Sequence, residues 1–122
     1  MKKTGFYLPK RLYLKEELFF RIESYLMSSG ADSGRVAILV ETRDHEPYTT
    51  LTVNFPYQHL EENEFCVKSW SENEDLVKAC YASGMVGPGM FIDTGKKTDD
   101  MGSPIWRFSP EIVEYIKMKQ EA

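Results

Sequence analysis

The chain has little cysteine, and its spacing does not suit metal or redox chemistry. Its two cysteines, Cys66 and Cys80, form no CxxC pair, whereas zinc sites and thiol redox sites use cysteines at short spacing. Cys66 lies in a strand-like apolar run and Cys80 in a helix-like one, so we expect two buried, reduced thiols. The sequence therefore favours neither a disulfide framework nor a cysteine-based metal site.

The sequence also lacks a long apolar run and an excess of positive charge. No stretch approaches the roughly 20 apolar residues that cross a bilayer, and the start MKKTGF is not followed by the apolar region of a signal peptide. The formal net charge is -4, which disfavours a general attraction to phosphates or anionic lipid. We expect a cytoplasmic protein that binds no membrane and no nucleic acid directly.

The composition that remains fits one folded domain. A length of 122 residues is enough to bury a core without disulfides or metals. The hydrophobic fraction of 42% and the aromatic fraction of 13% are those of a globular protein. We expect residues 1–122 to form a single domain in which residues 1–12 are poorly ordered.

Hydrophobic periodicity and end signals predict three helices. Apolar residues at helical spacing predict a helix over Lys15–Ser28 that ends at Gly30. The sequence SENE, residues 71–74, has the form of a capping box that begins a second helix, ended by Gly84. Ser109 and Pro110 form the N-cap and first position of a third helix.

Short apolar runs between turn signals predict about five strands. They cover residues 35–41, 48–55, 64–68, 85–93 and 103–109. The predicted order is α-β-β-β-α-β-β-α, and hairpins rather than βαβ crossovers indicate a mostly antiparallel sheet in an α+β fold. Trp70 is expected to close the core beneath the third strand.

The motifs that would indicate a cofactor or a metal are incomplete. Gly87 and Gly89 follow a helix rather than preceding one, and Gly95-Lys96-Lys97-Thr98 lacks the first glycine of a Walker loop. His45 and His59 lie in separate loops, which favours two solvated turn residues. We therefore predict no cofactor, no metal and no catalytic residue.

Two alternatives to this non-enzymatic prediction remain open. One is a small hydrolase or transferase with a site built from Cys66 or Cys80, His59 and nearby glutamates, although a catalytic thiol needs an exposed and positive setting. The other is a small-molecule or nucleotide sensor. Binding without turnover separates the leading prediction from the first alternative, and a thermal shift with a ligand panel tests the second.

Charge is distributed unevenly along the chain. Basic residues crowd the amino end, whereas the segment from Glu61 to Asp75 contains six acids and a single lysine. One interpretation is that these acids only solvate a loop and support a helix start. The other is an acidic face that binds a basic protein partner and gains on-rate from the complementary potential. The predicted partner-binding residues are Glu61, Glu62, Glu64, Glu72, Glu74, Asp75 and Trp70.

Two strings in this region resemble a known family. LTVNFP, residues 51–56, and FCVKSWSEN, residues 65–73, followed by Gly84 and the pair Thr94-Gly95, are similar to the domain-of-unknown-function family 4313 of small bacterial proteins. The resemblance covers roughly residues 35–108 and leaves the predicted helix Lys15–Ser28 outside the pattern. It implies a protein of phages or conjugative elements, with no assigned reaction or ligand.

Charge polarity and this resemblance together predict an interaction protein of a mobile element. The predicted partner is a basic protein, such as a nuclease or another defence effector. An anti-restriction or anti-CRISPR inhibitor is the concrete form of this prediction, since an acidic face can compete with nucleic acid for a nuclease groove.

Overall fold

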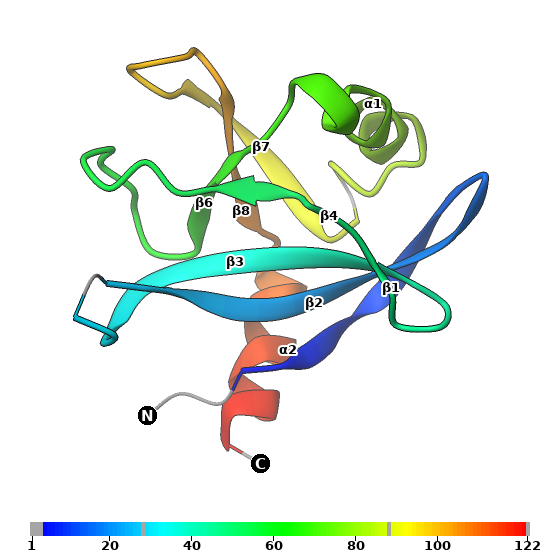
Figure 1. Ribbon diagram of the computed structural model, residues 1–122, viewed down its shortest axis with the longest axis horizontal. Coiled ribbons are helices and arrows are strands. Elements are labelled where there is room, and N and C mark those ends of the chain that lie inside the picture. Colours follow the sequence, from blue (N-terminus) through cyan, green and yellow to red (C-terminus); the bar gives the residue numbers. More distant parts are fainter. Residues whose placement is uncertain (1–3, 28, 88, 122) are drawn as a thin grey trace.

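The computed structural model describes residues 4–27, 29–87 and 89–121. Across these residues, eight strands form two four-stranded antiparallel sheets, and two α-helices complete an α+β fold (Figure 1). None of the described helices is long and apolar enough to cross a membrane.

The first sheet replaces the helix predicted near the amino end. Its strand order is β1-β2-β3-β4, with β1 at Phe6–Leu14, β2 at Glu16–Leu26, β3 at Asp32–Thr42 and β4 at Pro47–Thr50. The prediction of a helix over Lys15–Ser28 is therefore wrong up to residue 27, and Ser28 lies outside the described residues. Leu18, Phe20 and Ile22 alternate into the core, as strand residues do.

The chain start is also more regular than expected. Residues 6–12, which fall in the stretch predicted to be poorly ordered, belong to β1. Phe6, Leu8 and Leu12 are buried in the core, so burial of apolar side chains holds this strand in place. Residues 1–3 lie outside the described residues.

The second sheet contains the remaining strands in the order β5-β6-β8-β7. Its members are β5 at Thr52–Val53, β6 at Glu64–Val67, β7 at Phe91–Lys97 and β8 at Pro104–Phe108. The predicted strand over residues 48–55 is divided between the two sheets at Leu51. The Leu51 amide donates to the Ile38 carbonyl at 2.9 Å, and the Leu51 carbonyl accepts from the Lys68 amide at 2.8 Å.

The helices lie in the middle and at the carboxyl end of the chain. A 3-10 turn, Ser71–Asn73, leads into α1 at Glu74–Ala82, and α2 covers Pro110–Glu121. Gly84, at a φ of +79°, follows α1 as predicted. The predicted N-cap of α2 is confirmed, because the Ile112 amide donates to the Ser109 hydroxyl at 3.4 Å.

The predicted capping box is wrong. Ser71 has a φ of +57°, and neither the 3-10 turn nor α1 has a side-chain cap. The buried Asn73 side chain ties the turn to the first sheet instead. Its Oδ1 accepts from the Thr49 hydroxyl at 2.7 Å, and its Nδ2 donates to the Thr50 carbonyl at 2.8 Å.

The predicted fold order is thus corrected to β-β-β-β-β-β-α-β-β-α. The class, α+β with antiparallel pairing, is as predicted, but a single sheet of about five strands with three helices is not what forms. The causes are the conversion of the first predicted helix into β2, the addition of β1 beside it, and the division of the predicted strand over residues 48–55 into β4 and β5.

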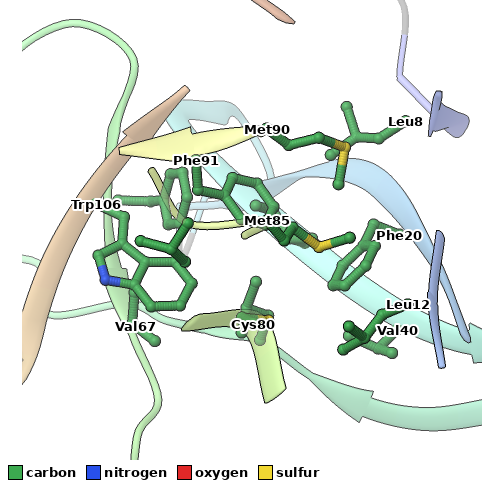
Figure 2. Packing of buried hydrophobic residues seen from close by; sticks show 14 of the residues in the cluster. Leu8, Leu12, Phe20, Val40, Val67, Cys80, Met85, Met90, Phe91 and Trp106 are labelled. Carbon is green, nitrogen blue, oxygen red and sulfur yellow. The ribbon is translucent and has the colours of Figure 1, made fainter. Parts of the chain in front are cut away.

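Aromatic side chains from both sheets meet in the core (Figure 2). Phe91 of β7 stacks on Trp106 of β8 at 5.7 Å between ring centroids, and it meets Phe20 of β2 edge-on at 5.8 Å. Trp106 therefore occupies the central position that was predicted for Trp70, which is only half-buried.

Candidate partner-binding cleft

The acidic segment is divided in space into two groups. Glu61, Glu62 and Glu64 lie in and after the loop that precedes β6, whereas Glu72, Glu74 and Asp75 lie on the 3-10 turn and the first turn of α1. Figure 1 shows this loop and α1 at opposite ends of β6. The structure therefore brings together the first three predicted residues and separates them from the last three, with Trp70 next to the second group.

Arg35 and Glu64 fix the loop before β6. The Arg35 guanidinium on β3 donates to the carbonyls of Phe55 at 2.9 Å and Gln58 at 2.6 Å. One Glu64 oxygen accepts from the Glu61 amide at 2.8 Å, and the other lies 2.7 Å from Lys96 Nζ. Glu64 exposes only 6% of its side chain, so its carboxylate anchors the loop more than it faces solvent.

This loop forms one wall of a cleft of about 560 Å³. The opposite wall comes from the end of the β2–β3 hairpin, and α2 contributes Ile116 and Gln120. Four carboxylates line the cleft against one guanidinium, that of Arg35, which is already bound to loop carbonyls. The four acids are Glu23, Glu61, Glu62 and Glu64.

The cleft also offers an unpaired acceptor close by. Asn54 Oδ1 is buried and has no hydrogen-bond partner among the described residues. It lines a small pocket of about 10 Å³ that shares Arg35, Leu60 and Glu64 with the cleft. An unpaired buried acceptor is costly, and a space of this size admits no more than about one water molecule.

Glu61 carries a charge at the mouth of the cleft. Its carboxylate lies 2.9 Å from His59 Nε2, and this hydrogen bond lowers the pKa of Glu61 below its usual value. Glu61 and Glu62 are both exposed. The cleft is therefore suited to a cationic group that carries several N–H donors, which is the chemistry of arginine and lysine side chains.

The second acidic group has local partners that account for it. Glu72 pairs with Lys68, and the hydrogen bond from Lys68 lowers the pKa of Glu72 to about 2. Glu74 lies 3.3 Å from Lys78 one turn later in α1. Glu74 and Asp75 also lie in the first turn of α1, where the helix dipole favours acids. These residues stabilise a helix start and line no described cleft.

The thiols do not have the environment of a nucleophile. Cys66 and Cys80 are both buried. Desolvation raises the pKa of Cys66 and raises that of Cys80 to about 12, whereas a catalytic thiol needs a lowered pKa. His59 is exposed, and its ring pairs with Glu61.

We expect both thiols to be unreactive in the folded protein. At pH 8 a thiol with a pKa near 12 is almost entirely protonated, and the thiolate is the reacting form. An aromatic disulfide reagent should therefore label Cys66 and Cys80 slowly at pH 8, and rapidly once the chain is unfolded in denaturant. Rapid labelling of one thiol in the native protein would revive the hydrolase alternative.

Several cleft residues were not predicted from the sequence. The predicted helix contains Glu23, and the predicted strands contain Arg35, which lines the cleft, and Asn54, which lies beside it. Their local sequence carries no signal, because the cleft arises where the β2–β3 hairpin faces a loop that begins after β5. Among the described residues, no three His, Cys, Asp or Glu side chains are grouped to hold a metal ion.

No family model, no curated protein sequence and no solved structure matches the chain. The resemblance to family 4313 therefore stays a prediction, and the case for a function is carried by the geometry of the cleft.

Proposed function

We propose that this protein is a non-enzymatic binding protein whose acidic cleft receives a basic segment of a protein partner. The observation that carries the proposal is the convergence of four carboxylates on one cleft whose single lining guanidinium is already bound to backbone carbonyls. An arginine or lysine side chain supplies the missing charge and the N–H donors.

The roles of the four acids follow from their exposure and contacts. Glu61 and Glu62 are exposed at the mouth, where their charges attract the partner and contribute to its affinity once it is bound. Glu23 is half-buried on β2 and meets the cation inside. Glu64 holds the loop in place through Lys96 and the Glu61 amide. The partner-binding set thus becomes Glu23, Glu61 and Glu62, with Glu64 as a positioning residue.

The partner class that we favour is an enzyme with a basic nucleic-acid groove, such as a nuclease of a defence system. The surface of such an enzyme carries the arginine and lysine side chains that contact phosphates. An acidic protein bound there excludes the nucleic acid, so inhibition follows from occupation of the groove without any chemical step. The resemblance to proteins of mobile elements supports this direction.

The charge-matched test compares the two halves of the acidic segment. One double variant carries Glu61→Gln and Glu62→Gln, and the other carries Glu72→Gln and Glu74→Gln. Both remove two negative charges from the chain, but only the first changes residues that line the cleft. We expect the first double variant to bind an arginine-rich peptide at least about tenfold more weakly, equivalent to about 1.4 kcal/mol. The second should bind as the unmodified protein does. Isothermal titration calorimetry at two salt concentrations measures both.

Two results would contradict the proposal. Equal losses in the two double variants would mean that the peptide senses only the overall charge, and no binding by the unmodified protein at low salt would remove the cleft as a cation site. Circular dichroism and thermal unfolding of each variant show whether the loop remains folded. Glu64 is left unchanged because its loss would release the loop itself.

A further inference from the structure

A second groove, of about 360 Å³, lies at the other end of the first sheet. It is formed by β1, by Phe19 of β2 and by the turn between β3 and β4. Figure 1 shows that this turn and the β2–β3 turn beside the acidic cleft lie at opposite ends of β3. The groove is lined by Tyr7, Leu8, Pro9, Lys10, Arg11, Phe19, Arg43 and His45.

The charge that this groove presents to solvent is positive. Its lining includes the cations Lys10, Arg11 and Arg43 and no carboxylate. Glu17 bridges the two arginines, at 2.6 Å from Arg11 Nη1 and 3.6 Å from Arg43 Nε, but it exposes only 11% of its side chain. Arg11 and Arg43 expose 57% and 79% of theirs. The acid therefore lies beneath the guanidinium groups and holds them in position.

Aromatic rings form the floor of the groove. Tyr7 meets Phe19 edge-on at 6.5 Å between centroids, and it lies 5.6 Å from the His45 ring. The Arg11 guanidinium lies over the Phe19 ring, with its central carbon 5.6 Å from the ring centroid. Stacking surfaces beside cations are the combination that binds an aromatic base and its phosphate.

A hydrogen-bonded network beneath the floor fixes these rings. The Tyr7 hydroxyl donates to Glu41 Oε1 at 2.6 Å, and the second Glu41 oxygen lies 3.2 Å from Arg21 Nη1. The same hydroxyl is 2.8 Å from His45 Nδ1. Because the Tyr7 hydroxyl hydrogen is directed at Glu41, Nδ1 of His45 is the donor in the contact between the two rings. The buried Glu41 carboxylate thus orients both the phenol and the imidazole.

We propose that this groove binds a nucleotide unit, with the base stacked on the Tyr7–Phe19–His45 floor and the phosphate beside Arg11 and Arg43. The acidity of the whole chain does not oppose this, because the acids of the cleft lie at the far end of the sheet while the groove has a local excess of cations. The unit is either a free nucleotide or one residue of a single strand, since the two share this chemistry. The proposal does not depend on the acidic cleft.

The test is fluorescence anisotropy with a labelled oligothymidine of about 12 nucleotides, a length within the range of single-strand sites. Arg43→Gln should weaken binding and reduce the slope of log K against log salt by about 0.7, the loss of one phosphate contact. Phe19→Leu keeps an apolar side chain but removes the ring, and should weaken binding at least about fivefold. Arg107→Gln on β8 is the matched control, because it removes an exposed arginine outside the groove.

A competitor distinguishes a free nucleotide from a single strand as the ligand, and an abasic probe tests whether the base stacks on the floor. Competition by AMP at concentrations comparable with the oligonucleotide identifies a mononucleotide site, whereas binding of the strand alone identifies a single-strand site. Equal binding of an abasic strand would overturn the stacking floor. Absence of binding at low salt, or an equal loss in Arg43→Gln and Arg107→Gln, would overturn the site. Thermal unfolding of Phe19→Leu shows that a loss of binding is not a loss of fold.

Discussion

Trp106→Ala is expected to lower the free energy of unfolding by about 3–5 kcal/mol, the usual range for loss of a buried aromatic side chain. Trp106 is fully buried in the core, against side chains of β6, β7 and α1. It stacks on Phe91, meets Tyr81 at a right angle with centroids 5.5 Å apart, and donates from Nε1 to the Tyr81 hydroxyl at 3.1 Å. A domain of this size is stable by only about 5–15 kcal/mol. Denaturant unfolding followed by circular dichroism measures the loss.

The second tryptophan provides the control for this prediction. Trp70 is half-buried and lies outside the aromatic core, so Trp70→Ala should cost clearly less than Trp106→Ala. If Trp106→Ala fails to fold, Trp106→Phe tests the same position, because the smaller ring cannot donate to Tyr81 and leaves part of the space unfilled. A greater loss from Trp70 than from Trp106 would contradict the core described above.

The strand β2 shows why hydrophobic spacing alone predicted a helix where a strand forms. Leu18, Ile22 and Leu26 are spaced by four residues, which satisfies a helix, but 18, 20 and 22 also alternate as in a strand. Phe19 also fits the helical stripe in sequence, yet it lies on the outer face of the sheet, where it lines the groove beside β1. Pairing of β2 with both β1 and β3 decides the outcome, and those contacts are not local in sequence.

Elements with chemical end signals were predicted better than elements with periodicity alone. Ser109 and Pro110 begin α2 and Gly84 follows α1, because an N-cap hydroxyl, a fixed proline φ and a left-handed glycine act within a few residues. The predicted capping box at Ser71 does not form. The Asn73 side chain instead fixes this turn with two hydrogen bonds to β4. A tertiary contact thus replaced a local one.

The candidate sites could be predicted only in part for the same reason. The acids from Glu61 to Asp75 lie within one short segment of the sequence, but β6 separates them into a cleft group and a helix-start group. Glu23 joins the cleft from a strand that was read as a helix. Charge polarity along the chain therefore indicated a region, whereas the folded sheets determine which carboxylates converge.

The glycines after α1 have a structural role that can be measured. Gly89→Ala is expected to lower the free energy of unfolding by at least about 3 kcal/mol, at the upper end of overpacking effects. An alanine Cβ there would lie 2.6 Å from the Gly84 carbonyl oxygen and 2.8 Å from the Met85 Cα. Both are backbone atoms, and the Met85 carbonyl is itself held by the Phe91 amide at 2.9 Å. The turn cannot yield without disturbing the start of β7.

Gly102→Ala separates this steric effect from the general effect of adding a methyl group to a glycine. Gly102 has open space around its Cβ position and a φ of +66°, so its replacement should cost only the left-handed backbone strain of about 1–2 kcal/mol. Equal losses at the two positions would mean that the segment 84–89 moves to accept the methyl group. A larger loss at Gly89 would show that close approach of the backbone explains this glycine.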